Sequence, residues 1–264
     1  MFNNSIDKID LVMWTLNSEK TLKRTLKSIE NAVPKKYVNK KILVDAHSTD
    51  GTQKIAKDFG WKIFEYKKGI GRQANYAVSL VETDVFASFE SDIIINPDWL
   101  KLKKYLVDNI AVVQGVRYSV NPLLNSFEHT AVRYGSEYSS IDNTLYRTEV
   151  IRNLGSFNKS LLYCADAELK ERVLNAGYYW LVRYDVISKH LKTSLKQSAR
   201  ALQKHKLKDT YMKSREGTNN FLKFFLSFPI GFYIALNYRL PLAVFAYPYW
   251  RSIKLQTMLK KGLK

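Results

Sequence analysis

Acidic residues in three short segments have the chemistry to bind a cation or to accept a proton. Glu90 and Asp92 follow an apolar run and are separated by one residue. Mg²⁺ and Mn²⁺ prefer carboxylate oxygens, so such a pair suits a divalent cation. Asp45 follows another apolar run, and Asp166 precedes a segment with helical periodicity. Because isolated carboxylates often only cap turns and helices, the joint placement of these acids decides their meaning.

The elements that must position these acids follow a βαβ pattern over the first hundred residues. Short apolar runs alternate with amphipathic stretches, which is typical of an α/β fold with a largely parallel sheet. We expect strands over 11–15, 42–45, 62–65 and 85–89, and helices over 19–30, 52–59 and 71–81. Ligands of open α/β sheets gather beyond the carboxyl ends of the strands. Asp45 and Asp92 both lie at such ends.

The chain after residue 98 has weaker patterns. We expect helices over 99–106 and 168–176 and a strand over 111–116. The Tyr-, Ser- and Asn-rich stretch between them has little periodicity. A simple N-cap role for Asp166 on the later helix remains an alternative to a chemical role.

Four motifs, taken in order, resemble family 2 glycosyltransferases. Residues 44–52 read VDAHSTDGT where the family commonly has VDDGSTDGT, so Ala46 and His47 depart from the pattern. The segment GIGRQANYA contains Arg72, and Glu90-Ser91-Asp92 stands where the family has a metal-binding acid-x-acid motif, with Glu in place of the usual first Asp. The segment YCADAEL, followed by NAGY, resembles the acidic pair at the head of a helix, with Ala165 in place of the common Glu.

The resemblance implies a role for each matching residue on the donor side. Asp45 contacts the nucleotide base, and Arg72 pairs with the diphosphate or the base. Glu90, Ser91 and Asp92 belong to the nucleotide-sugar site. A solvated surface arginine remains the alternative for Arg72, and for Asp50 a capping role is at least as plausible as a ligand role.

The resemblance also implies the metal and the base. Asp92 binds Mg²⁺ or Mn²⁺, and His190 lies where many members place a histidine near the metal. Asp166 is the general base that takes the acceptor proton, and inversion at the anomeric carbon follows. If the acceptor is an ionised lipid phosphate, a base is less necessary, and Asp166 then orients that group.

The implied fold is the GT-A type, a Rossmann-like mostly parallel sheet flanked by helices, with an aromatic and apolar helical appendage at the C-terminus. We interpret residues 1–193 as the catalytic domain, with a nucleotide-binding half over 1–98 and an acceptor-binding half over 99–193. Residues 194–264 form a basic and apolar region for membrane association.

Composition limits the partners and the compartment. The chain has 264 residues, 46% hydrophobic and 13% aromatic residues and a net charge of +18, so an anionic partner is expected. The single cysteine, Cys164, excludes an intrachain disulfide and a Cys-based zinc site, which fits a reducing compartment. The N-terminus lacks the layout of a secretory signal. We expect the protein at the cytoplasmic side of the cell membrane.

The C-terminal region suggests how the membrane is contacted. Residues 224–238 form an uncharged run shorter than the ~20 residues of a usual transmembrane helix, and Pro229 interrupts it. Aromatic residues flanked by Lys and Arg favour peripheral or monotopic binding to an anionic surface. The basic amphipathic stretch over 194–213 adds charge. A helical pair packed on the domain, a dimer contact and a bent span over 221–250 remain alternatives.

The leading hypothesis is an inverting, metal-assisted transfer of sugar from a UDP- or GDP-sugar to a polyprenyl phosphate, a lipid or a lipid-linked glycan. A nucleotidyltransferase is less favoured, because the Gly-rich basic loop expected after the first strand is missing. A nucleic-acid-binding protein explains the charge, but no recognised binding motif is present. An inactive nucleotide-sugar-binding membrane protein is the remaining alternative.

Overall fold

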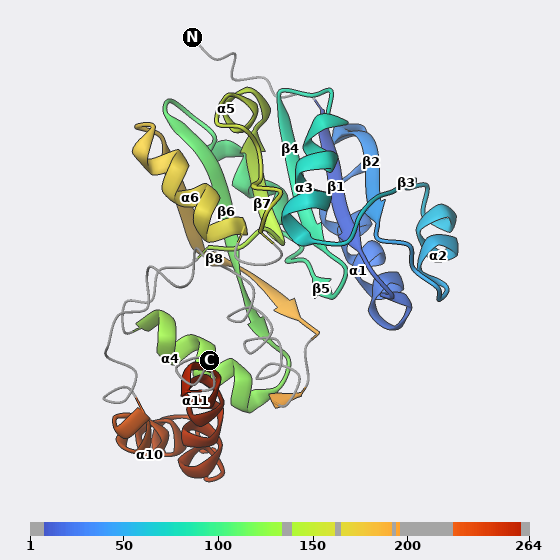
Figure 1. Ribbon diagram of the computed structural model, residues 1–264. Coiled ribbons are helices and arrows are strands. Elements are labelled where there is room, and N and C mark those ends of the chain that lie inside the picture. Colours follow the sequence, from blue (N-terminus) through green and yellow to red (C-terminus); the bar gives the residue numbers. More distant parts are fainter. Residues whose placement is uncertain (1–7, 134–138, 162–164, 192–193, 196–223, 260–264) are drawn as a thin grey trace. The chain divides into compact units, whose positions relative to one another are not determined.

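The chain forms an eight-stranded mixed sheet with helices on its faces and two further helices near the C-terminus (Figure 1). The structure is a computed structural model that describes residues 8–133, 139–161, 165–191, 194–195 and 224–259. Cys164 and most of the basic stretch over 194–213 therefore lie outside the described residues.

The first half of the chain supplies four parallel strands. In the sheet order β3-β2-β1-β4-β7-β6-β8-β5, these are the first four neighbours, and each predicted strand is confirmed with longer bounds or the same bounds. The elements are β1 (Ile9–Thr15), α1 (Glu19–Ala32), the 3₁₀ helix η1 (Lys35–Tyr37), β2 (Val38–Asp45), α2 (Thr52–Asp58), β3 (Lys62–Glu65), α3 (Ile70–Ser79) and β4 (Val85–Glu90).

The second half completes the sheet with antiparallel pairings. β7 is antiparallel to both β4 and β6, and β5 is antiparallel to β8. The elements are β5 (Ile93–Ile94), the 3₁₀ helix η2 (Trp99–Tyr105), β6 (Ile110–Ser119), α4 (Pro122–Arg133), β7 (Asn143–Arg147), α5 (Thr148–Asn153), α6 (Ala165–Asn175), β8 (Tyr179–His190), α10 (Ser227–Asn237) and α11 (Ala243–Leu259).

The core lies against the parallel strands. Every residue of β1 is buried, as expected for a central strand covered on both faces. The predicted apolar face of α1 is confirmed, since Leu22, Leu26 and Ile29 are all buried in the main hydrophobic cluster. Because core atoms pack at crystal-like density, this face fixes α1 against the sheet and sets the loop that follows β1.

Helix α3 lies across one face of the parallel strands and brings a distant segment close (Figure 1). At Gly71, an added Cβ would come within 2.1 Å of the Asn158 carbonyl and 2.6 Å of the Leu161 carbonyl. Gly71 N–H also donates to Leu161 O over 3.1 Å. Only glycine permits this approach. The contact holds residues 158–161 against α3.

The predictions for the middle of the chain were less accurate. The helix expected over 99–106 is the 3₁₀ helix η2, and neither α4 nor β7 was predicted. α4 begins at Pro122, a residue suited to a first helical turn, and the Asn121 side chain accepts from the N–H groups of Leu123 and Leu124. This start signal was present in the Asn-Pro pair, but the surrounding periodicity was weak.

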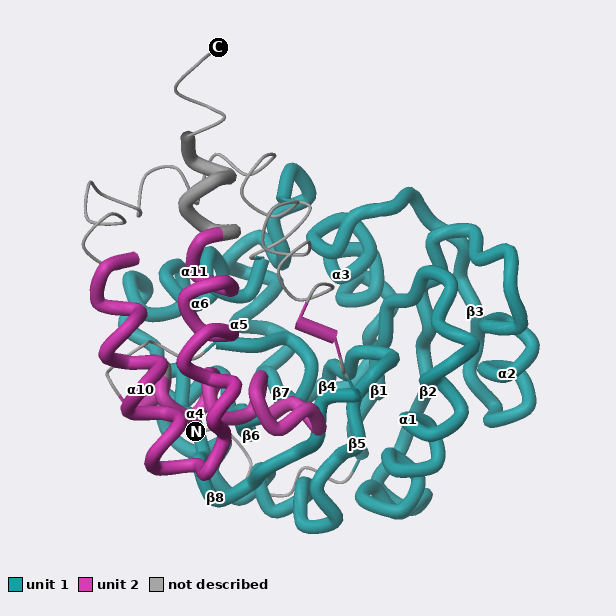
Figure 2. The backbone as a smooth tube through the Cα atoms, turned by 90° about the horizontal axis from the view of Figure 1, so that it is seen from below, with its two compact units in different colours: residues 1–117, 138–191 teal, residues 118–137, 192–264 magenta. Residues whose placement is uncertain are grey.

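The chain divides into two compact units, coloured separately in Figure 2. The first contains residues 1–117 and 138–191, and the second contains 118–137 and 192–264. In the second unit, α10 and α11 contact each other and α4. Among the helices that the structure describes, none combines the length and the apolarity needed to span a membrane.

Candidate active site

The carboxylates of Asp45, Glu90 and Asp92 lie at one edge of the sheet, as the βαβ pattern predicted. In the register of the parallel strands, Thr15 of β1 pairs with Asp45 of β2, and Trp14 pairs with Glu90 of β4. Asp92 follows β4 by two residues. The carboxyl ends of these strands therefore place the acids of two motifs, 45 residues apart in the chain, along one edge.

Asp45 is fully buried, and its carboxylate is satisfied by neighbouring residues. Oδ1 accepts from the hydroxyls of Thr15 (2.8 Å) and Ser48 (2.6 Å). Oδ2 accepts from the Ser48 N–H (2.7 Å) and from Gln53 Nε2 (3.0 Å). These four bonds tie the loop after β2 to β1 and α2, so in this conformation Asp45 stabilises the loop.

That loop contains the two departures from the family pattern. His47, where the pattern has Gly, has φ +57° and lies in the left-handed region. Gly adopts this region without penalty, and His enters it more readily than most residues do. The substitution therefore keeps the turn at a cost in strain. Asp50 precedes Gly51, the N-cap residue of α2, and accepts from the N–H of Thr52 (3.0 Å), the first residue of the helix.

A second cluster joins Glu90 and Asp92 to His190. Ligand atoms of the three residues all lie within 4.8 Å of one another, and His190 Nε2 is 3.2 Å from Asp92 Oδ2. The pairing follows from backbone register: Ile93 of β5 pairs with His190 of β8. His190 is buried, whereas the Asp92 side chain is 38% exposed. Two carboxylates and an imidazole suit Mn²⁺ or Mg²⁺, so the residues fit the implied metal.

Arg117 contacts the ring nitrogen of His190 that does not face Asp92, and Asp142 pairs with Arg117. Arg117 Nη1 lies 2.9 Å from His190 Nδ1, and Arg117 Nε forms an ion pair with the buried carboxylate of Asp142. Ser140 contacts that carboxylate as well. Because a guanidinium can only donate, it directs a lone pair of Nδ1 toward itself and orients the ring. Neither residue was predicted, because Arg117 follows the strand expected over 111–116, Asp142 lies in the stretch with little periodicity, and neither belongs to a motif.

Asp166 lies in the first turn of α6 and not at the N-cap position. Burial raises the pKa of its carboxyl above the usual value, although backbone N–H groups, the charge of Arg117 and the Ser139 hydroxyl (3.3 Å from Oδ2) oppose the shift. A carboxylate with a raised pKa is a better base. The elevated pKa therefore agrees with the role that the resemblance implied.

Electrostatic interactions link Asp166 to residues of the cation cluster. Arg117 contacts His190 and also acts electrostatically on Asp166. Burial raises the pKa of Tyr146, and the negative charges of Asp166 and Glu90 add to the effect. Both carboxylates thus act electrostatically on one hydroxyl. These interactions link Asp166 to Glu90 of the cation cluster.

The sequence of residues 10–162 matches the model of the family described as Glycosyl transferase family 2. The chain belongs to this family. The matched segment includes Asp45, Arg72, Glu90, Ser91 and Asp92 but ends before Asp166 and His190. The expected roles of those two residues therefore rest mainly on their surroundings in the structure. No curated protein sequence matches this glycosyltransferase.

Solved glycosyltransferase structures share the GT-A fold of this chain. Mannosyltransferase PcManGT from Pyrobaculum calidifontis, in complex with GDP-Man and Mn²⁺, has a TM-score of 0.65 at 14% identity over 94% of this chain and 86% of its own. Glucosyl-3-phosphoglycerate synthase from Mycobacterium tuberculosis, in complex with Mn²⁺, UDP and glucosyl-3-phosphoglycerate, has 0.56 at 17% identity, over 77% and 82%. S. aureus TarS 1-349 with UDP has 0.55 at 22% identity, over 74% and 63%.

The remaining predicted donor residues of the glycosyltransferase lie nearby in the fold but outside the cation cluster. Ser91 Oγ donates to Ser18 Oγ over 2.7 Å, which joins the acid-x-acid turn to the start of α1. Arg72 is exposed in the first turn of α3. Within the described part of the chain, Arg72 forms no ion pair, so its charge is available to a ligand.

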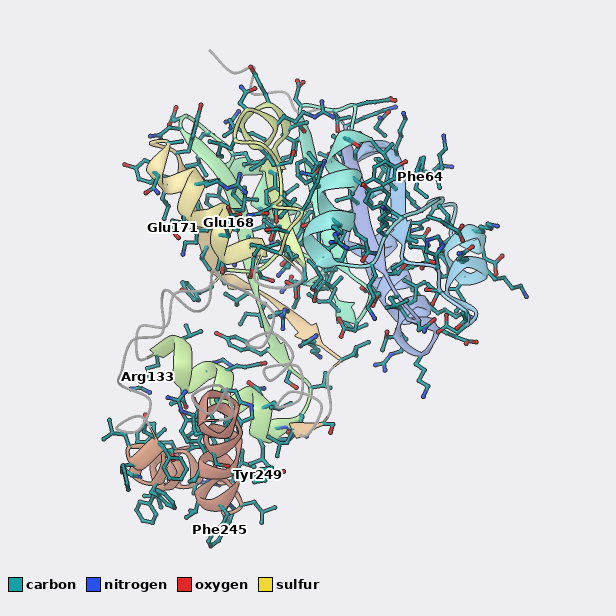
Figure 3. The ribbon with its side chains drawn as sticks, in the orientation of Figure 1. Phe64, Arg133, Glu168, Glu171, Phe245 and Tyr249 are labelled. Carbon is teal, nitrogen blue, oxygen red and sulfur yellow. The ribbon has the colours of Figure 1, made fainter. Side chains whose placement is uncertain are left out.

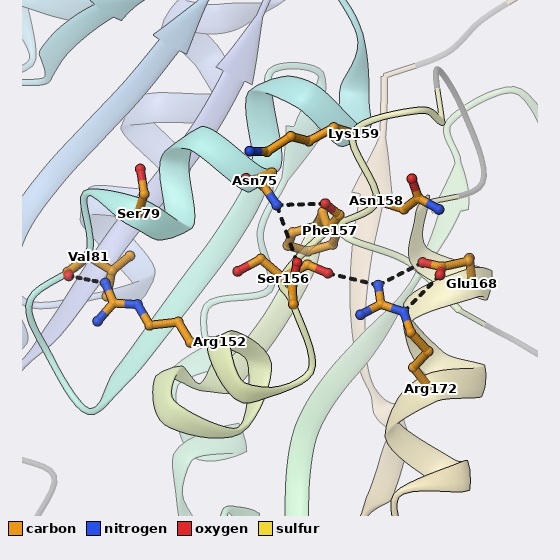
Figure 4. A pocket seen from close by; sticks show the side chains of 11 residues that line it. Asn75, Ser79, Val81, Arg152, Ser156, Phe157, Asn158, Lys159, Glu168 and Arg172 are labelled. Atoms are coloured by element: carbon orange, nitrogen blue, oxygen red, sulfur yellow. Dashed lines mark hydrogen bonds and ion pairs between the residues drawn. The ribbon is translucent and has the colours of Figure 1, made fainter.

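A separate groove of about 990 Å³ lies between α3, α5 and α6 (Figure 4). Its arginines are engaged by the chain itself: Arg152 donates to the carbonyls of Val78 (2.9 Å) and Val81 (2.6 Å), and Arg172 pairs with Glu168 (2.7 Å). None of the predicted acids lines it. We therefore place the candidate reaction centre at the acidic cluster and not in this groove.

Proposed function

We propose that this glycosyltransferase moves a sugar from a UDP- or GDP-sugar to a membrane-linked acceptor with inversion, assisted by Mg²⁺ or Mn²⁺. The acceptor class is a polyprenyl phosphate, a lipid or a lipid-linked glycan. The observation that carries the proposal is the cluster of Glu90, Asp92 and His190, together with Arg117, which contacts His190 and acts electrostatically on Asp166. These residues have the chemistry needed for both leaving-group stabilisation and proton removal.

On the donor side, Glu90, Asp92 and His190 are the residues that would hold the cation. When bound, the cation supplies positive charge next to the diphosphate. Arg72 adds a fixed positive charge from the first turn of α3. We propose that the nucleotide base binds Asp45 by replacing the Gln53 amide, which can remain bonded to Glu65 (2.7 Å). The other three hydrogen bonds of Asp45 then stay in place.

On the acceptor side, Asp166 removes the proton from an acceptor hydroxyl. The hydroxyl oxygen forms the new bond to the anomeric carbon while the bond to the diphosphate oxygen breaks, and the proton remains on Asp166. Attack from the face opposite the diphosphate inverts the anomeric centre. If the acceptor is an ionised phosphate, Asp166 has no proton to take and orients the acceptor instead.

The complexes formed by the structural neighbours support the donor class. PcManGT is described with GDP-Man and Mn²⁺, and the M. tuberculosis synthase with UDP and Mn²⁺. TarS 1-349 is also described in complex with UDP-GlcNAc. These ligands cover two bases and different sugars, so they leave the donor of this chain open between UDP- and GDP-sugars.

The proposed location is the cytoplasmic side of the cell membrane, with peripheral or monotopic attachment. The support is the net charge of +18 together with the apolar, aromatic character of residues 224–250. Basic segments are attracted to anionic lipid headgroups, and aromatic side chains favour the interface. A membrane-linked acceptor follows naturally for an enzyme that is held there.

The donor assignment is tested by thermal unfolding with UDP-, GDP- and CMP-sugars, each with and without Mn²⁺. A ligand that binds only the folded state raises the unfolding temperature. We expect one UDP- or GDP-sugar to stabilise the protein and Mn²⁺ to increase the shift. Asp92→Ala should remove the Mn²⁺-dependent part, whereas Asp98→Ala, which changes an exposed acid paired with Lys101, should retain it.

Two results would contradict the proposal. The first is an equal Mn²⁺ response in the Asp92→Ala and Asp98→Ala variants. The second is donor binding without any transfer or hydrolysis of the sugar across membrane-derived acceptors, which would identify an inactive nucleotide-sugar-binding protein.

A further inference from the structure

The helix pair α10 and α11 has a well-packed inner face. Together with α4 it forms a small core of Leu124, Phe127, Ile234, Ala243 and Tyr247. The two helices approach closely at Gly231, where an added Cβ would lie 2.9 Å from the Ala243 carbonyl. The inner faces of α10 and α11 are therefore buried within the second unit.

The outer face of the pair is apolar and exposed. Its large side chains range from 51% exposed for Phe228 to 77% for Phe245. The stripe comprises Phe225, Phe228, Phe232 and Leu236 on and before α10, and Leu242, Phe245 and Tyr249 on and before α11. The spacing of three or four residues puts each set on one side of its helix. Phe245 and Tyr249 point away from α11 in Figure 3.

Charge around this outer face identifies the occupant. Arg239 is the only charged residue between positions 224 and 250, and it lies at the turn between the helices. In the sequence on either side, Lys and Arg outnumber acids over 194–223, and no acid occurs over 251–264. Two copies of a chain with a net charge of +18 repel each other, whereas anionic lipid attracts each copy.

We propose that the outer face of α10 and α11 docks on an anionic lipid bilayer and inserts its Phe, Leu and Tyr side chains among the lipids. Apolar side chains leave water, Tyr249 lies at the headgroup level, and the net positive charge of the chain attracts the anionic headgroups. This inference deepens the membrane part of the proposed function by naming the surface that makes the contact.

Vesicle flotation tests the docking surface with the full chain. Phosphatidylcholine vesicles with and without phosphatidylglycerol are compared for the unaltered chain, for Leu242→Ser/Phe245→Ser and for the control Leu174→Ser/Tyr179→Ser. The control changes two exposed apolar residues of the first unit, 45% and 60% exposed. We expect binding that requires phosphatidylglycerol, at least about tenfold weaker for the α11 variant and unchanged for the control.

Several results would overturn the inference. They are equal vesicle binding by the two double variants, no vesicle binding by the unaltered chain, or self-association that Leu242→Ser/Phe245→Ser abolishes in the absence of lipid. The last result would identify a second copy as the occupant. Donor-induced thermal stabilisation is measured on the same samples. Vesicle binding without donor stabilisation would contradict the proposed enzyme function but support the docking surface, and donor stabilisation without vesicle binding would do the reverse.

Discussion

The loop around Asp45 and the cluster around Asp92 lie at the same edge of the sheet, yet they use their acids differently. Asp45 is buried, and local residues between positions 15 and 53 donate all four of its hydrogen bonds. Asp92 is partly exposed and gathers with Glu90 and His190, the latter from 98 residues away. In this conformation the Asp45 carboxylate therefore stabilises the loop, whereas the Asp92 carboxylate remains accessible to a ligand.

The largest effect on transfer is expected from removing the proposed general base, Asp166. Asp166→Asn keeps the size of the side chain but cannot accept a proton, so transfer to a hydroxyl acceptor should fall by about 10²–10⁴-fold. Donor-induced stabilisation should persist, because the acids at the sheet edge are untouched. Initial rates and thermal shifts measured on one preparation separate the two effects, and an equal loss of both would assign Asp166 to donor binding.

The same carboxylate predicts the pH dependence of transfer. Because burial raises the pKa of Asp166, the base becomes protonated and inactive while the pH is still above the ordinary carboxyl value of 3.8. The acid limb of the rate profile should therefore lie above that pH and disappear for an acceptor that is already ionised. An acid limb at or below 3.8 would contradict the role.

The next largest effect is expected from the Arg117–Asp142 ion pair that orients His190 in the Asp92 cluster. Arg117→Leu leaves the Asp142 carboxylate buried without its cation, which should destabilise the fold by about 3–5 kcal/mol. Urea unfolding measures the loss, and Arg117→Leu/Asp142→Leu should recover a large part of it. In that recovered variant, the Mn²⁺ concentration at half-maximal stabilisation should rise about 10–100-fold, because His190 has lost its orienting partner. An unchanged Mn²⁺ midpoint would show that Arg117 serves folding alone.

Asp45 provides the opposite case. Asp45→Asn removes charge-assisted hydrogen bonds from a buried group and should cost about 2–3 kcal/mol of unfolding free energy without altering the Mn²⁺ response. Asp92→Asn should have the reverse profile, with stability nearly unchanged and the Mn²⁺ response lost. If the two variants behave alike in urea unfolding and in Mn²⁺ titration, the distinction between the two regions is wrong.

The smallest expected effect concerns the turn after Asp45. His47→Gly should remove the backbone strain that the positive φ causes at this position and stabilise the protein by up to about 1 kcal/mol. The greater flexibility of Gly in the unfolded chain offsets part of this stabilisation. His47→Ala retains the Cβ and should give no gain. Thermal unfolding of both variants decides whether backbone strain or the His47 side chain governs the turn.

Local patterns in the sequence determined much of the nucleotide-binding half. Apolar runs and amphipathic periods predicted β1 to β4 and α1 to α3, because each of these elements is specified by residues within a few turns of one another. The acids at the ends of β2 and β4 were predicted for the same reason, as was the family. The weakly periodic middle was not, and α4, β7 and the 3₁₀ character of η2 emerged only in the fold.

Only the tertiary structure decided what each acid does. The burial of Asp45, the approach of His190 to Asp92 and the Arg117–Asp142 ion pair depend on backbone register and packing between residues that are 25 to 98 positions apart. The sequence determined which residues have the chemistry, and strand pairing decided which of them meet. The physical reason is that solvent exposure and hydrogen bonding, which separate a structural carboxylate from a reactive one, are properties of neighbours in space and not along the chain.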